Sequence, residues 1–202
     1  MTANNLPKYL FCLVPSAEES NIFRAEAHDL SLELGLGYSI NKSEIPFHIT
    51  VIPPFRTYQP TQMIAMAQRI LPSIDNPVLQ TKSLEIFTDT DTSQPSDVVF
   101  RINASSRLKQ MHDRLLSILE IYRVAGDNEI TYKERRFGSN FVGENYSPHL
   151  SLFKIPAGFP VSDSFSKRCS EERRHFITAS KATLLRKDPS SSWAMETEFL
   201  LK

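Results

Sequence analysis

Two short strings of the same form recur along this chain, and they limit how it can fold. They read PFHIT and PHLS, and their motifs are His48–Thr50 and His149–Ser151, 149 − 48 = 101 positions apart. Both strings lie in apolar runs that are typical of β-strands. Because alternate side chains of a strand point to the same face, we expect each histidine to project beside its hydroxyl residue, with the apolar residue between them turned into a core.

Each motif strand therefore gives two of three positions on one face to polar side chains. That loss of buried surface is more typical of a functional site than of a packed core. A single motif of this kind usually marks a surface pair or a satisfied core pair. The second copy, on another predicted strand, favours catalysis.

Apolar periodicity and capping signals predict the other elements. Ser16 fits a helix N-cap followed by acidic residues, and Gly35 fits a helix stop. The predicted strands are 9–14, 47–52 (ending at the following prolines), 78–87, 98–103, 149–155, 176–186 and 193–201, and the predicted helices are 17–34, 60–71, one capped by Ser105 or Ser106, and a weak one at 162–174.

This order predicts an α/β (α+β) chain in which two halves repeat strand, helix, motif strand, helix and strand, with one motif in each half. If the halves pack about a pseudo-two-fold axis, His48 and His149 face each other across one groove. The long segment 126–146 has little apolar periodicity, and a loop of that length is usually functional or disordered.

Composition limits the kinds of ligand and partner that we expect this protein to bind. Lys+Arg and Asp+Glu are both 23, so the net charge is zero, which favours a small ligand or a nucleic-acid end over a long nucleic acid. Cys12 and Cys169 are the only cysteines, and we read them as two free thiols, although a disulfide stays open. No apolar run approaches membrane-spanning length. We expect a soluble cytoplasmic monomer without a membrane association or an obligate protein partner.

The two motifs, with proline-containing entries and in particular the string SPHLSLF, resemble those of the two-histidine (2H) phosphoesterase superfamily, in its LigT-like and 2′,3′-cyclic phosphodiesterase branch. The resemblance covers nearly all of the chain. It implies one domain over residues 1–202, with two pseudo-symmetric antiparallel-sheet lobes, outer helices and a central groove. It also implies that His48, Thr50, His149 and Ser151 are the catalytic residues, acting on a nucleotide or a short oligonucleotide.

Histidine suits this chemistry because its unperturbed pKa lies near neutrality, so it can accept or donate a proton. One histidine can take the proton of the attacking oxygen while the other protonates the leaving oxygen, and the hydroxyl groups can donate hydrogen bonds to the phosphate oxygens. We expect no metal and no other cofactor. Two histidines are too few for a usual zinc site, and the motifs lack the carboxylates of Mg²⁺ sites. Nucleophile-elbow, Walker and Rossmann patterns are missing from the sequence.

Weaker substrate-binding candidates follow the motifs or precede them. Arg56 and Lys154 are candidates for meeting a phosphate, and Tyr146 and Phe55 are candidates for stacking a base, although surface and core roles are equally open. The long loop contains three basic residues, Lys133, Arg135 and Arg136. They could form a lid over an anionic ligand, or they could be a run of solvated surface charges.

The three remaining histidines, His28, His112 and His175, are expected to be solvated or capping residues. The predicted activity is cleavage of a 2′,3′-cyclic phosphate or of a short 2′,5′-linked or cyclic oligonucleotide, including nucleotide second messengers of the kind degraded in viral immune evasion. Two alternatives stay open: RNA-end processing or 2′,5′ RNA ligation, and a non-catalytic nucleotide-binding module.

Overall fold

The computed structural model describes residues 5–36, 47–88, 92–122, 124, 146–179 and 181–202. The strands are β1 (Lys8–Leu13), β2 (Ile49–Arg56), β3 (Val78–Thr88), β4 (Pro95–Ile102), β5 (His149–Lys154), β6 (Phe176–Thr178), β7 (Lys181–Lys187) and β8 (Trp193–Leu200). The helices are α1 (Ala17–Glu33), α2 (Pro60–Ile70), α3 (Ser106–Tyr122) and α5 (Asp163–Cys169), with a 3₁₀ turn, η2 (Leu71–Ser73), after α2.

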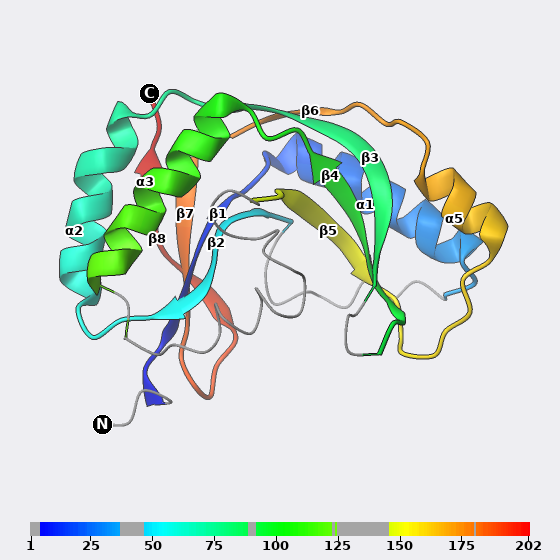
Figure 1. Cartoon of the computed structure of the whole chain (residues 1–202), viewed down its shortest axis with the longest axis horizontal. Coiled ribbons are helices and arrows are strands. Elements are labelled where there is room, and N and C mark those ends of the chain that lie inside the picture. The colour runs from blue at the N-terminus through cyan, green and yellow to red at the C-terminus, as the bar shows by residue number, and fades with distance from the viewer. Residues whose placement is uncertain (1–4, 37–46, 89–91, 123, 125–145, 180) are drawn as a thin grey trace.

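The eight strands of the described residues join one sheet in the order β6-β3-β4-β5-β2-β1-β7-β8, and every neighbouring pair is antiparallel. The predicted α+β class with antiparallel lobes is thereby confirmed. Figure 1 shows the sheet bent into an arch, in which β2 and β5 diverge from the middle. The two motif strands are therefore the central pair, with three further strands on either side.

The helices cross between the lobes. α1 follows β1 in the chain, yet it packs on the other lobe, where the ring of Phe23 lies 5.7 Å from that of Phe100 on β4. α3 follows β4 and packs back on β2, where His112 contacts a backbone carbonyl. Figure 1 shows α2 and α3 beside one lobe and α1 and α5 beside the other. Each lobe is thus built from both halves of the sequence.

Local signals explain how α1 begins and ends. Ser16 caps the helix, because its hydroxyl accepts from the Glu19 N–H while the Glu19 carboxylate accepts from the Ser16 N–H. At the other end Gly35 adopts φ +78°, and the N–H of Leu36 donates to the Ser31 carbonyl. This left-handed closing turn is one that glycine makes without steric cost. Both predicted boundaries are confirmed.

Two strand predictions were wrong. The first motif strand does not end at its prolines: β2 continues through Pro53 and Pro54 to Arg56. These prolines lie where the register with β1 shifts, so the missing N–H groups interrupt no regular ladder there. The predicted strand 176–186 is in fact β6, which pairs with β3, and β7, which pairs with β1 in the other lobe.

The helix side of the sheet holds the main core. On β1, Tyr9, Phe11 and Leu13 belong to that core, and Leu10 and Cys12 form a second small cluster with Leu185 on the opposite face. No helix among the described residues is long and apolar enough to cross a membrane.

Candidate active site

The two motif strands meet at one registered pair, Ile49 opposite Leu150, and both side chains are fully buried in the main core. Continuing this antiparallel register by one residue in each direction sets His48 opposite Ser151 and Thr50 opposite His149. All four polar side chains then project from the side of the sheet that faces away from the main core. We call this side the motif face.

The register brings together residues of different motifs. In a regular antiparallel ladder, opposite residues have Cβ atoms about 5 Å apart, and diagonal residues such as His48 and His149 are about 7–8 Å apart. In a regular continuation of this register, each histidine would have the hydroxyl residue of the other motif as its cross-strand neighbour. Alternation along each strand predicted the pairing within each motif, and the repeated element order predicted that His48 and His149 face each other, but the cross-strand register was not readable from the chain.

The His149 ring is held from two sides. Its Nδ1 lies 3.2 Å from the Ser147 carbonyl oxygen, and its ring meets that of Phe87 at 4.8 Å in an edge-to-face arrangement. A carbonyl only accepts hydrogen bonds, so Nδ1 carries the proton in this contact. In the neutral imidazole the lone pair is then on Nε2.

Arg101 supports this arrangement from the neighbouring strand. It lies opposite His149 in the β4–β5 register, and its guanidinium carbon lies 4.8 Å from the centre of the Phe87 ring. Its Nη1 donates to the Ser147 hydroxyl, and its Nε donates to the Glu85 carboxylate at 2.5 Å. One cation thus orders both groups that contact the His149 ring.

On the other motif strand, a stacked pair binds the backbone. The rings of Tyr146 and His112 are 4.0 Å apart and nearly parallel. The Tyr146 hydroxyl donates to the Thr50 carbonyl at 3.0 Å, and His112 Nδ1 donates to the Val51 carbonyl at 2.7 Å. Val51 has no partner on β1, because the register shifts there between two neighbouring pairs. Both side chains therefore donate hydrogen bonds to backbone carbonyls of β2, at Thr50 of the motif and at the residue after it.

Burial governs the protonation of this pair. His112 is fully buried, and desolvation lowers its pKa below the usual value, although the hydrogen bond to Val51 acts in the opposite sense. Burial also raises the pKa of the Tyr146 hydroxyl. Both groups are therefore neutral near pH 7. The expectation that His112 is solvated or capping was wrong: it lies on the buried stripe of α3.

The other motif histidine is anchored through its neighbour. The Phe47 ring packs edge-on against Phe23 of α1 at 6.3 Å, so the residue before His48 is tied to the main core. His48 itself is half-buried. A helix of one lobe thus fixes the entry to the motif strand of the other lobe.

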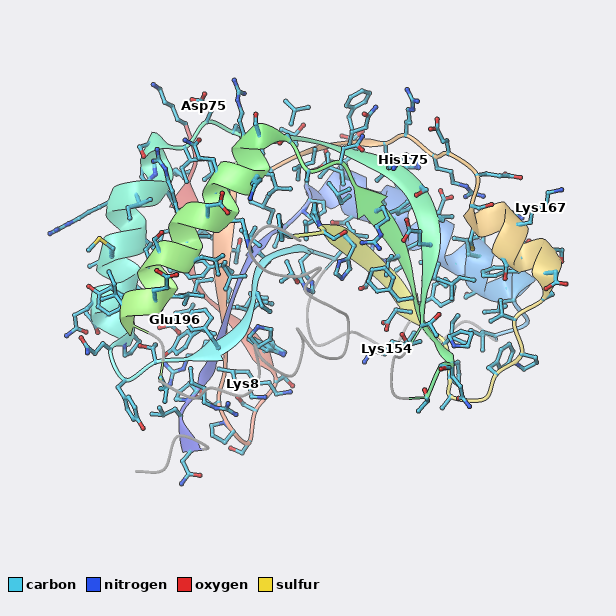
Figure 2. All side chains as sticks on the ribbon, in the orientation of Figure 1. Lys8, Asp75, Lys154, Lys167, His175 and Glu196 are labelled. Atoms are coloured by element: carbon cyan, nitrogen blue, oxygen red, sulfur yellow. The ribbon has the colours of Figure 1, made fainter. Side chains whose placement is uncertain are left out.

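The weaker candidates occupy different places. Arg56 and Lys154 end β2 and β5, where they face Lys8 and Asp97 respectively in the strand registers. Figure 2 shows Lys8 and Lys154 on the open side of the arch, whereas Asp75 and His175 lie along its top. Phe55 is fully buried against Phe11 in the core. The three loop residues Lys133, Arg135 and Arg136 lie outside the described residues.

The two other histidines lie beside acidic residues, and the two cysteines are buried. His28 is exposed beside Asp29, and His175 is near Glu26 with its pKa lowered by burial and then by Arg173. Cys12 and Cys169 are free thiols buried in different clusters, so the reading as thiols is confirmed. In the described part of the chain, no group of three or more histidine, cysteine or acidic side chains is placed to hold a metal ion.

Comparison with known proteins shows the fold. No family model matches the chain, and no curated protein matches it. Among solved structures, TT0787 of Thermus thermophilus superimposes with a TM-score of 0.65 and 12% identity over 96% of this chain and 97% of that chain. E. coli LigT complexed with phosphate superimposes with a TM-score of 0.55 and 10% identity over 98% of this chain and 99% of that chain.

A third structure, Kluyveromyces marxianus Usb1 with uridine monophosphate, gives a TM-score of 0.51 and 12% identity over 96% of this chain and 99% of that chain. A further match is described as a phosphoesterase. The likeness extends over nearly the full length of each chain. The bilobal fold that the motif resemblance implied is therefore the fold of this protein.

Proposed function

We propose that this protein is a metal-independent phosphodiesterase that cleaves a 2′,3′-cyclic phosphate or a short oligonucleotide with a 2′,5′ or cyclic linkage. The observation that carries the proposal is the single registered pair between β2 and β5, which brings both histidine motifs to one place on the sheet. A site for proton transfer at both ends of a phosphodiester needs two such groups within reach of one phosphorus atom.

In the proposed reaction, one motif histidine is neutral and takes the proton from the attacking oxygen. The other is protonated and gives its proton to the departing oxygen as the phosphorus–oxygen bond breaks. With Nδ1 bound to the Ser147 carbonyl, His149 would use Nε2 in either role. The two roles exchange in the reverse reaction, and each transfer typically contributes ~10²–10⁴-fold in rate.

The hydroxyl residues act on the phosphate itself. Thr50 and Ser151 share the motif face with the histidines, and Ser151 is exposed. Their hydroxyl groups would donate hydrogen bonds to the non-bridging oxygens, where charge gathers in the transition state. Such preorganised donors commonly contribute as much as a proton transfer.

The comparisons support a nucleotide-type substrate. Structures of E. coli LigT were determined with phosphate, with ATP and with 3′-AMP, and that of Usb1 with uridine monophosphate. The zero net charge also favours a ligand of nucleotide size over a long nucleic acid. Second-messenger degradation stays one expectation within this class.

The test is turnover on a panel of 2′,3′-cyclic nucleotides, 2′,5′-linked oligoadenylates and cyclic dinucleotides, with EDTA present. His48→Ala and His149→Ala should each lower kcat at least ~10²-fold. His28→Ala, a change at an exposed histidine on α1, is the matched control and should keep wild-type turnover. Near-normal activity of either motif variant on the cleaved substrate would show that the acid–base assignment is wrong.

A further inference from the structure

Glutamates at seven-residue intervals on α1 bind one stretch near the C-terminus, residues 168–178. At one end of the series, Glu19 accepts a hydrogen bond from the backbone N–H of Thr178 at 2.7 Å. At the other end, Glu33 forms an ion pair with Arg168. Seven residues are close to two turns of an α-helix, so these carboxylates lie on one face of α1.

Glu26, the middle glutamate of the series, makes a more sheltered attachment than Glu33. Its carboxylate forms an ion pair with Arg173 and lies 3.8 Å from Nε2 of His175. The side chains of Glu26 and Arg173 are 18% and 20% exposed, whereas those of Glu33 and Arg168 are 34% and 43% exposed. Because a partly buried pair is screened less by solvent and salt, the Glu26 pair is the stronger attachment.

Thr81 of β3 holds the same residues from the other side. Thr81 is fully buried, and its hydroxyl accepts from the His175 N–H at 2.7 Å and donates to the Arg173 carbonyl. Its own N–H donates to the His175 carbonyl at 2.9 Å. Figure 1 shows the connection from α5 to β6 passing beside β3, where Figure 2 labels His175. This connection is therefore fixed between α1 and β3.

The His175 ring completes an aromatic cluster on the helix side of the sheet. It meets the ring of Phe23 at 6.0 Å and that of Phe100 at 5.5 Å, both edge-to-face. Phe23 lies among the glutamates on α1, and its ring also meets that of Phe47 at 6.3 Å. We call Phe23, Phe47, Phe100 and His175 the aromatic cluster.

Two members of the aromatic cluster adjoin the motifs. Phe47 directly precedes His48, and Phe100 lies opposite Leu150, the residue that follows His149. Both phenylalanine side chains pack in the main core, so the cluster supports the motif strands from the side opposite the motif face. The position of one helix therefore affects both motif histidines at once.

We propose that Glu26 is a positioning residue for the reaction, because it holds the aromatic cluster that sets the separation of His48 and His149. This rests on the proposed function, in which both histidines must reach one phosphorus atom. Glu26 itself lies on the helix side of the sheet, so it acts through the cluster and does not contact the substrate. A shift of about 1 Å in a reacting group can lower the rate ~10²-fold, so a small movement of the cluster is measurable in kcat.

The kinetic test compares Glu26→Gln with Glu33→Gln on the substrate of the panel that the wild-type protein cleaves best. Both variants are assayed at a temperature at which thermal unfolding shows them fully folded. Glu26→Gln keeps the size of the side chain but removes its charge, and it should lower kcat about three- to tenfold with KM within about twofold of wild type, since misplaced groups act on the chemical step.

Glu33→Gln is the matched control, because it removes the same charge from the same helix and from an ion pair with the same stretch of chain. It should keep the wild-type kcat and KM. A wild-type kcat in Glu26→Gln, or an equal fall in both variants, would overturn the positioning role and would mean that the glutamates only stabilise the fold.

Two changes at His175 test whether the effect passes through the aromatic cluster. His175→Phe keeps an aromatic ring against Phe23 and Phe100 and should retain most of the wild-type kcat. His175→Ala removes that ring and should lower kcat by about the same factor as Glu26→Gln. Equal kcat values in the two His175 variants would overturn the route through the cluster.

A measurement without turnover separates this inference from the proposed function. The proton–nitrogen NMR signals of the His48 and His149 rings, assigned with His48→Ala and His149→Ala, report the surroundings of each ring. We expect these signals to shift in Glu26→Gln and to keep their wild-type positions in Glu33→Gln. If the wild-type protein cleaves no substrate of the panel, the proposed function fails, and the NMR signals still decide whether Glu26 positions the histidines. Unshifted signals in Glu26→Gln would overturn the inference.

Discussion

The hydrogen bond from Tyr146 to the first motif strand gives a sharp test of how the site is held. Tyr146→Phe removes one oxygen atom and keeps the ring that stacks on His112. The Thr50 carbonyl then loses this donor at a partly buried position. An ordinary hydrogen bond contributes about 0.5–1.5 kcal/mol, and a buried group left unpaired costs about 1–3 kcal/mol. We expect the free energy of unfolding to fall by about 1–2 kcal/mol.

For a chain of about this size, 1 kcal/mol corresponds to about 2–4 °C in Tm. The measurement is urea unfolding at pH 7.5 together with thermal unfolding, alongside steady-state kinetics. Tyr58→Phe is the matched control, because that side chain is 57% exposed. It should change neither quantity.

Activity separates a positioning role from a merely structural one. Thr50 carries the carbonyl on its backbone and, on the motif face, the hydroxyl assigned to the phosphate. A displaced strand should therefore lower kcat about tenfold at temperatures where the variant is fully folded, with a small change in KM, since misplacement of reacting groups acts on the chemical step. If Tyr146→Phe unfolds at the wild-type denaturant concentration and keeps its kcat, the carbonyl contact does not hold the motif and the reasoning fails.

Three further predictions follow from neighbouring groups. Because burial lowers the folded-state pKa of His112, the unfolded chain takes up a proton first as the pH falls below about 6.5, so the free energy of unfolding should be at its full value above that pH and decline below it. His112→Asn, whose amide can still donate to Val51, should make this decline shallower in urea titrations at pH 7.5 and 5.5. An unaltered difference in unfolding free energy between the two pH values would refute the assignment. Arg101→Lys keeps the charge but loses the planar fork that joins Ser147, Glu85 and the Phe87 ring, so kcat should fall more than stability, whereas equal losses in both would point to packing alone. Turnover should survive chelation and show a bell-shaped pH dependence from one neutral and one protonated histidine, and a requirement for added divalent ions in dialysed protein would contradict this mechanism.

The features that could be predicted from the sequence are those that depend on local residue patterns. Alternation on a strand identified both motifs and the burial of Ile49 and Leu150, and capping chemistry identified Ser16 and Gly35 as helix boundaries. These features need only the nearest neighbours along the chain. The strand order needs more, since the pairing of Ile49 with Leu150 joins residues from the two halves of the sequence.

Supporting residues were missed for the same reason. Arg101, Phe87 and Glu85 reach His149 through the registers of three strands, and no spacing within one segment reveals that. His112 was different, because a signal was present: it lies four positions after Leu108 and three before Leu115, within the apolar stripe of α3. A polar residue in such a stripe predicts a buried group with a partner.

The exchange of helices between lobes has a consequence for how the protein matures. A ribosome that has released residues up to β4 has delivered His48, but not α3, which covers β2, nor β7, which covers the outer edge of β1. Such an intermediate exposes open strand edges, which are prone to pairing with other chains. Folding to completion must await the last strands, and it should be slow, as in chains whose pairings are distant in sequence.

The same exchange makes a divided chain interdependent. Two fragments separated between α3 and β5 would each carry one motif and parts of both lobes, so neither alone would complete a lobe or the central pair. Activity would then appear only when the fragments reassemble. This is the behaviour wanted in a split reporter, in which an enzymatic signal records the meeting of two fused partners.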